Sequence, residues 1–294
     1  MKDKYVNLFT DFGFKKLFGE EDSKEHLIAF LNTLLPAHHH IQDLSFTHSE
    51  KLGITPIDRR AVFDLNCIST TGEHFIVELQ KAKQNYFKDR SVFYATFPIQ
   101  QQAEKGDWDF KLAAVYTIGI LDFEFEDDKA QGSQDVVHTV QLKDQHNQVF
   151  YDKCTFIYLT MPNFHKTEAE LETDQDKWLF LFKNLHKLQA VPRRLQEKIF
   201  LRIFEKAQIA KFDPEELKRY QSSLKIYRDI KNVVDTAHDE GFEEGIEEGR
   251  LSERQAIARK LLPTMADQAI AQLTDLTPEQ VAALRTGKTD ESRH

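Results

Sequence analysis

The sequence predicts an α/β fold, in the α+β arrangement, with a sheet in its N-terminal part and helices in the rest. Alternating apolar residues predict a β-hairpin over residues 61–80, and apolar runs predict strands over 111–125, 136–142 and 154–160. From about residue 173 onward the apolar residues recur at helical spacing. The 294 residues are 40% hydrophobic and include 23 Phe, which is enough for a substantial core.

These patterns divide the chain into three predicted regions. We expect an α/β domain over residues 1–165 and a helical extension over residues 166–235. Residues 236–294 form a third, helical region, which we expect to serve oligomerisation or partner binding.

Two helices are predicted to open the N-terminal domain. They cover residues 11–19 and 23–35, and the second stops before Pro36. Three adjacent histidines follow, at positions 38 to 40. Such a cluster can bind a transition metal, but an ordinary surface loop is the simpler expectation.

The alternation of the predicted hairpin determines its register. With the turn centred on Thr71, six apolar residues pair on one face: Phe63 with Leu79, Leu65 with Val77, and Cys67 with Phe75. A shift of one residue would place Leu65 against Glu78 and destroy this apolar face. The register that serves the core is therefore preferred.

This register sets two carboxylates opposite each other. Asp64 faces Glu78, with Cβ atoms about 5 Å apart, and Gln80 stands on the same face. Like charges at that separation destabilise a sheet unless a cation lies between them. A divalent cation relieves the repulsion, and Gln80 can hydrogen-bond a metal-bound water. The alternative is a polar sheet face that points into solvent.

Basic residues follow the hairpin directly. Residues 81–90 carry four bases and one acid, and a helix is predicted over residues 83–104. On it, Arg90 and Tyr94 lie one turn apart and share a face. Contact with phosphate groups is the functional interpretation for Lys88, Arg90 and Tyr94, and a solvated helix face is the alternative.

The C-terminal part is predicted to hold one long helix and two short ones. The long helix begins at Asp213 as N-cap with Pro214 behind it. The two short helices lie within residues 258–285, and Thr277 caps the second ahead of Pro278.

Three glycines recur in the acidic part of the long helix. Gly241, Gly245 and Gly249 have a four-residue period, which places them in one row along a helix. Each glycine destabilises a helix, and close contact with another helix would offset that loss. A flexible acidic linker is the alternative.

Composition narrows the class of protein. The formal charge of −9 argues against a generic basic nucleic-acid binder, although the acids of residues 239–248 supply much of it. The N-terminus lacks the apolar region of a signal peptide, and no run reaches the roughly 18 apolar residues that span a bilayer. Cys67 and Cys154 have no metal-type spacing. We therefore expect a cytoplasmic protein with two buried thiols and no membrane partner.

Five segments together resemble a known family. They are TDFGFKKLFG, the hairpin VFDLNC with TTGEHFIVELQ, FKDRSVFYA, AVYTIGILDFEF and GFEEGIEEGR. In this order they resemble the Rpn family, which comprises recombination-promoting nucleases and transposase-like proteins of the PD-(D/E)XK nuclease superfamily. The resemblance runs over nearly the whole chain and implies a core of mixed sheet flanked by helices. It also implies a Mg²⁺-dependent or Mn²⁺-dependent endonuclease that hydrolyses phosphodiester bonds in DNA, linked to recombination or mobile elements.

The resemblance also assigns roles by position. Asp64 and Glu78 correspond to the metal ligands, and Gln80 occupies the place of the superfamily's lysine. The lost cation is then expected from Lys83, or less readily from Lys81. A further acid from the first helices often completes such sites, and Asp11 and Glu25 are candidates, although helix capping explains Asp11 as well.

The resemblance to this family also implies which residues contact DNA, and it leaves alternative functions open. Lys81, Lys88, Arg90 and Tyr94 are the expected DNA-binding residues, and Arg90 and Tyr94 match the RSxxY pattern of the family. The alternative function is a weakly active or inactive nuclease-fold module that binds DNA or regulates, which Gln80 and the acidic charge favour. A scaffold built on the C-terminal helices, associating as a homo-oligomer, is a third possibility.

Overall fold

The computed structural model describes residues 3–47, 50–51, 61–62, 64–103, 109–126, 130 and 132–286. The chain divides into two compact units, Met1–Lys231 and Asn232–His294, and the helix α7 (Pro214–Leu261) contributes to both. We describe each unit by itself. Trp108 and Phe63 lie outside the described residues, as do several residues of the loop near 126–135.

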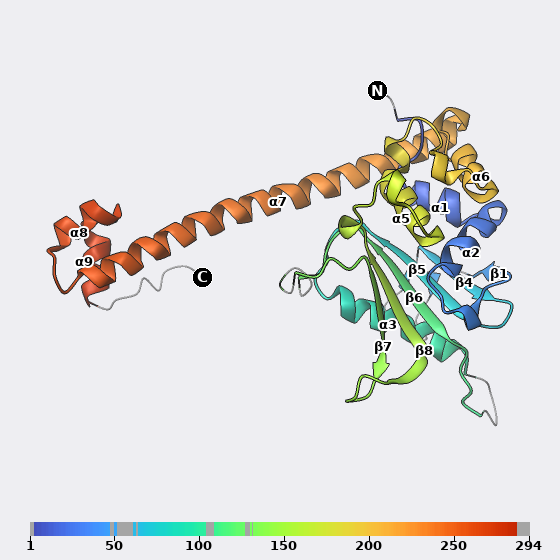
Figure 1. Cartoon of the computed structure of the whole chain (residues 1–294), viewed down its shortest axis with the longest axis horizontal. Coiled ribbons are helices and arrows are strands. Elements are labelled where there is room, and N and C mark those ends of the chain that lie inside the picture. Colours follow the sequence, from blue (N-terminus) through green and yellow to red (C-terminus); the bar gives the residue numbers. More distant parts are fainter. Residues whose placement is uncertain are drawn as a thin grey trace. The chain divides into compact units, whose positions relative to one another are not determined.

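A six-stranded mixed sheet forms the centre of the first unit, in the order β1-β4-β5-β6-β8-β7 (Figure 1). The parallel pairs are β5 with β6 and β6 with β8, while the outer pairs are antiparallel. The strands are β1 (Leu44–Phe46), β4 (Leu65–Ser69), β5 (His74–Gln80), β6 (Val115–Leu121), β7 (Val137–Lys143) and β8 (Val149–Thr160). A separate two-stranded sheet pairs β2 (Glu50–Lys51) with β3 (Ala61–Val62). The prediction of a mixed sheet flanked by helices is confirmed, although β1 was not expected.

The hairpin β4–β5 has the predicted register. Leu65 pairs with Val77 and Cys67 with Phe75, and all four side chains are buried. Leu79 is buried on the same face, while its expected partner Phe63 lies outside the described residues.

Helices cover both faces of this sheet (Figure 1). The apolar face of β5 packs in one core with α1 (Asp11–Phe18), α2 (Lys24–Asn32), α5 (Asp174–Asn184) and α6 (Lys198–Lys206). The helix α3 (Phe87–Gln101) lies against the opposite face, where Ile76 contacts Tyr94 and Phe97. Part of the face that carries Glu78 is therefore covered by α3. The connection from β5 to its parallel neighbour β6 runs through α3, as parallel pairing requires a crossover.

Several helix boundaries differ from those predicted. The side chain of Thr10, not Asp11, caps α1, because its hydroxyl accepts from the backbone N–H of Gly13 at 3.0 Å. A 3₁₀ turn (Glu21–Ser23) precedes α2, which ends at Asn32 rather than near residue 35. The helix α3 begins only at Phe87, so residues 81–86 form a loop instead of its predicted first turn.

The helices of residues 166–231 belong to the first unit. Trp178 and Phe182 of α5 are buried with Phe18 of α1, and the rings of Phe18 and Phe182 stack at 5.2 Å. Asp213 caps α7 as predicted, since its Oδ1 accepts from the N–H of Glu216 at 2.8 Å. Other short 3₁₀ turns lie at Ala37–His39, Met161–Asn163, Glu168–Glu170, Leu185–Lys187, Arg193–Leu195 and Ile209–Lys211.

The second unit holds the end of α7 together with α8 (Asp267–Thr274) and α9 (Pro278–Thr286). A small core of buried residues joins them: Ala258, Ile270, Ala271, Leu276 and Val281. Thr277 caps α9 as predicted, with its Oγ1 accepting from Gln280 at 3.2 Å. The acidic glycine segment is helical, not a flexible linker, because it lies within α7.

Three smaller expectations can be compared with the structure. Within the described part of the chain, no helix combines the length and apolar character needed to cross a membrane. Cys67 is buried as expected, whereas Cys154, where β8 begins to pair with β6, is only half-buried, and both are free thiols. Of the adjacent histidines, His38 and His39 lie in the 3₁₀ turn Ala37–His39, and His39 Nδ1 hydrogen-bonds the hydroxyl of Tyr116.

Candidate active site

The candidate site lies where β5 ends and β4 begins. Asp64 directly precedes β4, and extending the hairpin register by one residue places it opposite Glu78. Gln80 is the last residue of β5 and points to the same face as Glu78 because strand side chains alternate. The sequence reasoning therefore brought these three side chains together, as the structure also does.

Asp64 is held by the backbone of the neighbouring strand. Its Oδ2 accepts a hydrogen bond from the N–H of Leu79 at 2.7 Å. Burial raises the pKa of the Asp64 carboxyl and the charge of Asp11 adds to the rise, while the Leu79 N–H, Lys15 and Lys81 oppose it. The carboxylate thus lies in a confined setting with one oxygen oriented by the sheet.

Glu78 carries the clearest sign of an incomplete site. Its Oε1 is fully buried and has no hydrogen-bond partner among the described residues. Burial, and then the charge of Asp64, raises the pKa of Glu78 to about 8, although nearby Arg90 opposes the shift. A buried carboxylate oxygen without a partner is destabilising unless a cation or a proton satisfies it.

These two carboxylates fit a divalent cation. Each offers an oxygen, and a cation between them would remove both their repulsion and the orphaned state of Glu78 Oε1. Mg²⁺ is commonly bound by one or two carboxylates, with waters and substrate phosphates completing its shell. Within the described residues no group of three or more His, Cys, Asp or Glu side chains is arranged to hold a metal. The donor set is therefore a pair.

The two candidate further acids have other partners. Asp11 pairs with Lys15 at 2.9 Å, although its charge acts on Asp64. Glu25 pairs with Arg202 of α6. Neither forms a three-acid cluster with Asp64 and Glu78.

Gln80 is joined to Arg90, a contact that the sequence did not predict. The side chain of Gln80 is 8% exposed, and its Oε1 accepts a hydrogen bond from Arg90 Nη2. Arg90 Nη1 donates to Gln84 Oε1, so the two amide side chains hold one guanidinium. Its central carbon lies 5.7 Å from the ring centroids of both Phe87 and Tyr94. The orientation of Arg90 is thus set from several sides, next to Glu78.

The lysines near the site separate into two groups. Lys81 follows the end of β5, and its charge lowers the raised pKa of Asp64. Lys83 forms an ion pair with Glu126 and lines a pocket to which Asp64 and Glu78 do not contribute. The Lys88 ammonium lies 5.1 Å from the ring centroid of Phe125, on the same pocket. Of Lys81 and Lys83, it is Lys81 whose charge acts on Asp64.

Asp122 was not identified from the sequence, yet it adjoins the site. Its backbone N–H donates to the carbonyl of Gln80 at 2.9 Å. Its Oδ2 accepts from the hydroxyl of Tyr227, on α7, also at 2.9 Å. Burial raises the pKa of Asp122, whereas Tyr227 opposes the rise. The signal was present in the sequence, since an acid directly follows the apolar strand β6.

The sequence matches one known protein family over the part of the chain that contains this site. The model of one protein family, described as PD-(D/E)XK nuclease family transposase, matches residues 8–237, a range that includes the hairpin, α3 and β6. No curated protein and no solved structure matches the chain.

Proposed function

Since the chain belongs to the PD-(D/E)XK nuclease family of transposases, we propose that it is a metal-dependent DNA endonuclease linked to recombination or mobile elements. The observation that carries the proposal is the buried, unpartnered Oε1 of Glu78 opposite Asp64. A structural carboxylate oxygen usually gains a hydrogen-bond partner or reaches solvent, and among the described residues Glu78 Oε1 does neither.

In this proposal Asp64 and Glu78 would hold Mg²⁺ or Mn²⁺, with Glu78 Oε1 as one of the ligand oxygens. When bound, the ion supplies positive charge at the scissile phosphate and lowers the pKa of a water. The Leu79 N–H, by engaging Asp64 Oδ2, keeps the other oxygen of that carboxylate available as a ligand.

Arg90 would provide the cation that Gln80 cannot. The guanidinium carries a permanent charge next to Glu78, and Gln80 and Gln84 fix its direction. Charge that develops on phosphate oxygens is best stabilised by donors that are already oriented. The amide nitrogen of Gln80 is left to position the attacking water, because its oxygen accepts from Arg90.

One observation favours a slower enzyme or a binding module. Gln80 is an uncharged amide whose oxygen already accepts from Arg90, so it can hydrogen-bond a water but can neither take up its proton nor supply a positive charge. This is the second candidate function, a nuclease-fold module that binds DNA with little cleavage.

Plasmid nicking with Mg²⁺ or Mn²⁺, with EDTA as the metal-free control, tests the proposal. We expect Asp64→Ala and Glu78→Ala to lower the rate by about a hundredfold or more. Glu240→Ala, which removes an exposed carboxylate of α7, is the matched control and is expected to leave nicking unchanged. Activity that persists in both site variants would refute the site. Folded wild type that binds DNA without cutting it would favour the module.

We also propose that the second unit associates with another copy through α7. A Cβ atom built on Gly241, Gly245 or Gly249 would meet no atom within 4 Å, so within the described residues the glycine row is open. Phe242 and Ile246 beside this row are exposed. Truncation before residue 235, followed by light scattering, tests this association. A particle that still contains the same number of chains after truncation would refute it.

A further inference from the structure

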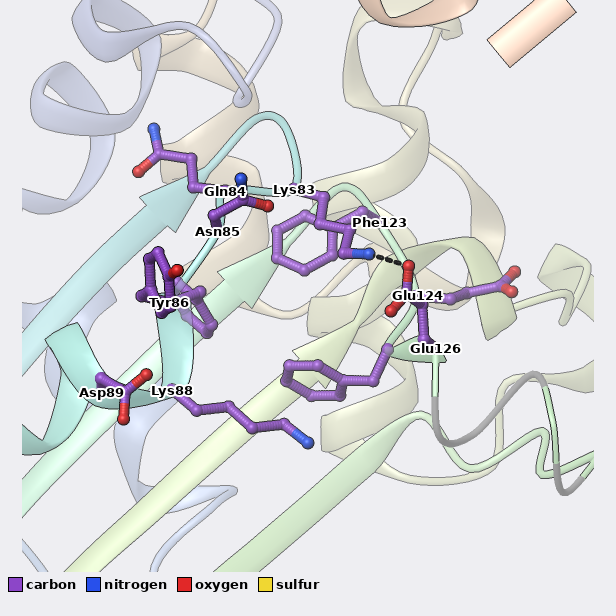
Figure 2. Close-up of a pocket in the computed structure, with 11 residues that line it drawn as sticks. Lys83, Gln84, Asn85, Tyr86, Lys88, Asp89, Phe123, Glu124 and Glu126 are labelled. Atoms are coloured by element: carbon purple, nitrogen blue, oxygen red, sulfur yellow. Dashed lines mark hydrogen bonds and ion pairs between the residues drawn. The ribbon is translucent and has the colours of Figure 1, made fainter. Parts of the chain in front are cut away.

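The pocket lined by Lys83 and Lys88 lies next to the candidate site. It has a volume of about 510 Å³ and is formed by the loop after β5, the first turn of α3 and the segment after β6 (Figure 2). Pockets of this size accommodate small organic groups. Its position beyond the carboxyl ends of two parallel strands is where α/β proteins commonly bind ligands.

The pocket is connected to the candidate site through Gln84 and Arg90. Gln84 lines it and also accepts a hydrogen bond from Arg90, which donates in turn to Gln80. A DNA strand that passes the acid pair can therefore place a neighbouring nucleotide in this pocket.

Tyr86 is unfavourable for folding where it stands. It is the N-cap of α3, has a left-handed backbone with φ of 61°, and provides no side-chain hydrogen bond to the helix. Asn, Ser or Gly would satisfy this position better, because they cap helices or tolerate positive φ. Its ring is nevertheless 80% exposed. Residues that break local rules in this way gather at functional sites.

The chemistry of the lining selects a base rather than a phosphate. Aromatic rings of Tyr86, Phe123 and Phe125 line the pocket, and the last two meet edge to face at 6.1 Å. The charged residues that line the pocket include two lysines, Lys83 and Lys88. They also include three acids, labelled in Figure 2: Asp89, Glu124 and Glu126. An acidic excess repels phosphate, whereas carboxylates accept from the amino groups of bases and aromatic faces stack on them.

We propose that this pocket binds an unpaired nucleobase of the DNA, stacked on Tyr86, so that the protein prefers DNA with an unpaired nucleotide beside the cleavage site. The inference rests on the proposed function and adds a substrate class to it. A fully paired duplex keeps its bases stacked inside and cannot fill the pocket without extruding one.

Binding in EDTA tests the pocket without cleavage. The probes are a short duplex with one extrahelical 2-aminopurine nucleotide and the same duplex without it. Wild type is expected to bind the first about tenfold more tightly and to quench its fluorescence. Tyr86→Ala is expected to lose both the preference and the quenching, whereas Tyr86→Phe keeps the ring and both effects.

Phe110→Ala is the matched control. Phe110 is also an exposed aromatic, at 77%, with a positive φ of 57°, but it does not line the pocket. It is expected to keep the wild-type preference. Equal affinity of wild type for the two duplexes, or a preference that survives in Tyr86→Ala, would overturn the inference. If the protein prefers the duplex with the extrahelical nucleotide but shows no Mg²⁺-dependent nicking, only the nuclease proposal is contradicted. If it nicks DNA but binds the two duplexes equally, only the pocket proposal is contradicted.

Discussion

Arg90, on α3, donates a hydrogen bond to the side-chain oxygen of Gln80, at the end of β5. The two residues are ten positions apart, and the contact places a permanent positive charge beside Glu78. In the proposed site, Arg90 would therefore supply from a neighbouring helix the positive charge that Gln80 lacks.

We predict that Arg90→Ala lowers the cleavage rate constant by about a hundredfold, because a preoriented charge is lost. Adding Gln80→Lys to Arg90→Ala is expected to restore part of the rate, since a lysine at position 80 returns a cation to the same face. Arg219→Ala, in which another guanidinium stacked on an aromatic ring is removed, is the control. Single-turnover cleavage is the measurement, and no loss in Arg90→Ala would contradict the prediction.

The pKa of Glu78 predicts an unusual dependence of stability on pH. Because the folded-state pKa is raised from 4.5 to about 8, the folded protein binds more protons than the unfolded chain between these values. The metal-free protein is therefore most stabilised by this group below pH 4.5 and loses that stability as the pH rises through 8. Glu78→Gln is expected to abolish nicking yet to raise the unfolding free energy at pH 8 by roughly 2–4 kcal/mol.

Urea unfolding in EDTA at several pH values measures this effect. Glu170→Gln is the control of opposite sign, because hydrogen bonds from Thr167 lower the pKa of Glu170. The stability from Glu170 is present above its ordinary pKa of 4.5 and is lost as the pH falls. If the Glu78→Gln protein is no more stable than wild type at pH 8, the prediction that burial raises the pKa of the Glu78 carboxyl is contradicted.

Asp64 is predicted to have separable roles in activity and in folding. Asp64→Asn and Asp64→Ala both remove the charge, so both are expected to abolish metal-dependent cleavage. Only the alanine leaves the buried N–H of Leu79 without its acceptor. We expect Asp64→Ala to be less stable than Asp64→Asn by about 1–2 kcal/mol in urea unfolding. Equal stability of the two would show that the Leu79 hydrogen bond is replaced.

The glycine row of α7 is predicted to serve association of two chains and to lower the stability of the helix itself. Replacing Gly241, Gly245 and Gly249 by alanine should strengthen the helix by about 1 kcal/mol at each position. The added methyl groups fill open space in the single chain but would block close approach of a second helix. A higher melting temperature by circular dichroism together with a smaller particle in light scattering is the expected result. An unchanged particle size would contradict the association.

Much of the fold was predictable because local patterns agree with the tertiary structure. The helices capped by Asp213 and Thr277 begin where predicted. The strand β1 was missed because a segment of three residues is too short to show alternation. The start of α3 was placed too early, since the loop of residues 81–86 contains no glycine or proline to mark it.

The sequence by itself determined the hairpin register and with it the pairing of Asp64 with Glu78. A period of two excludes a slip of one residue, and the turn at Thr71 selects the register that pairs Leu65 with Val77, so the acids share the other face. Tertiary structure decided which helix covers that face and which charged side chain lies beside Glu78. The crossover through α3 brings Arg90 onto Gln80, and no local pattern contains that information, because it depends on how a distant helix packs against the strand.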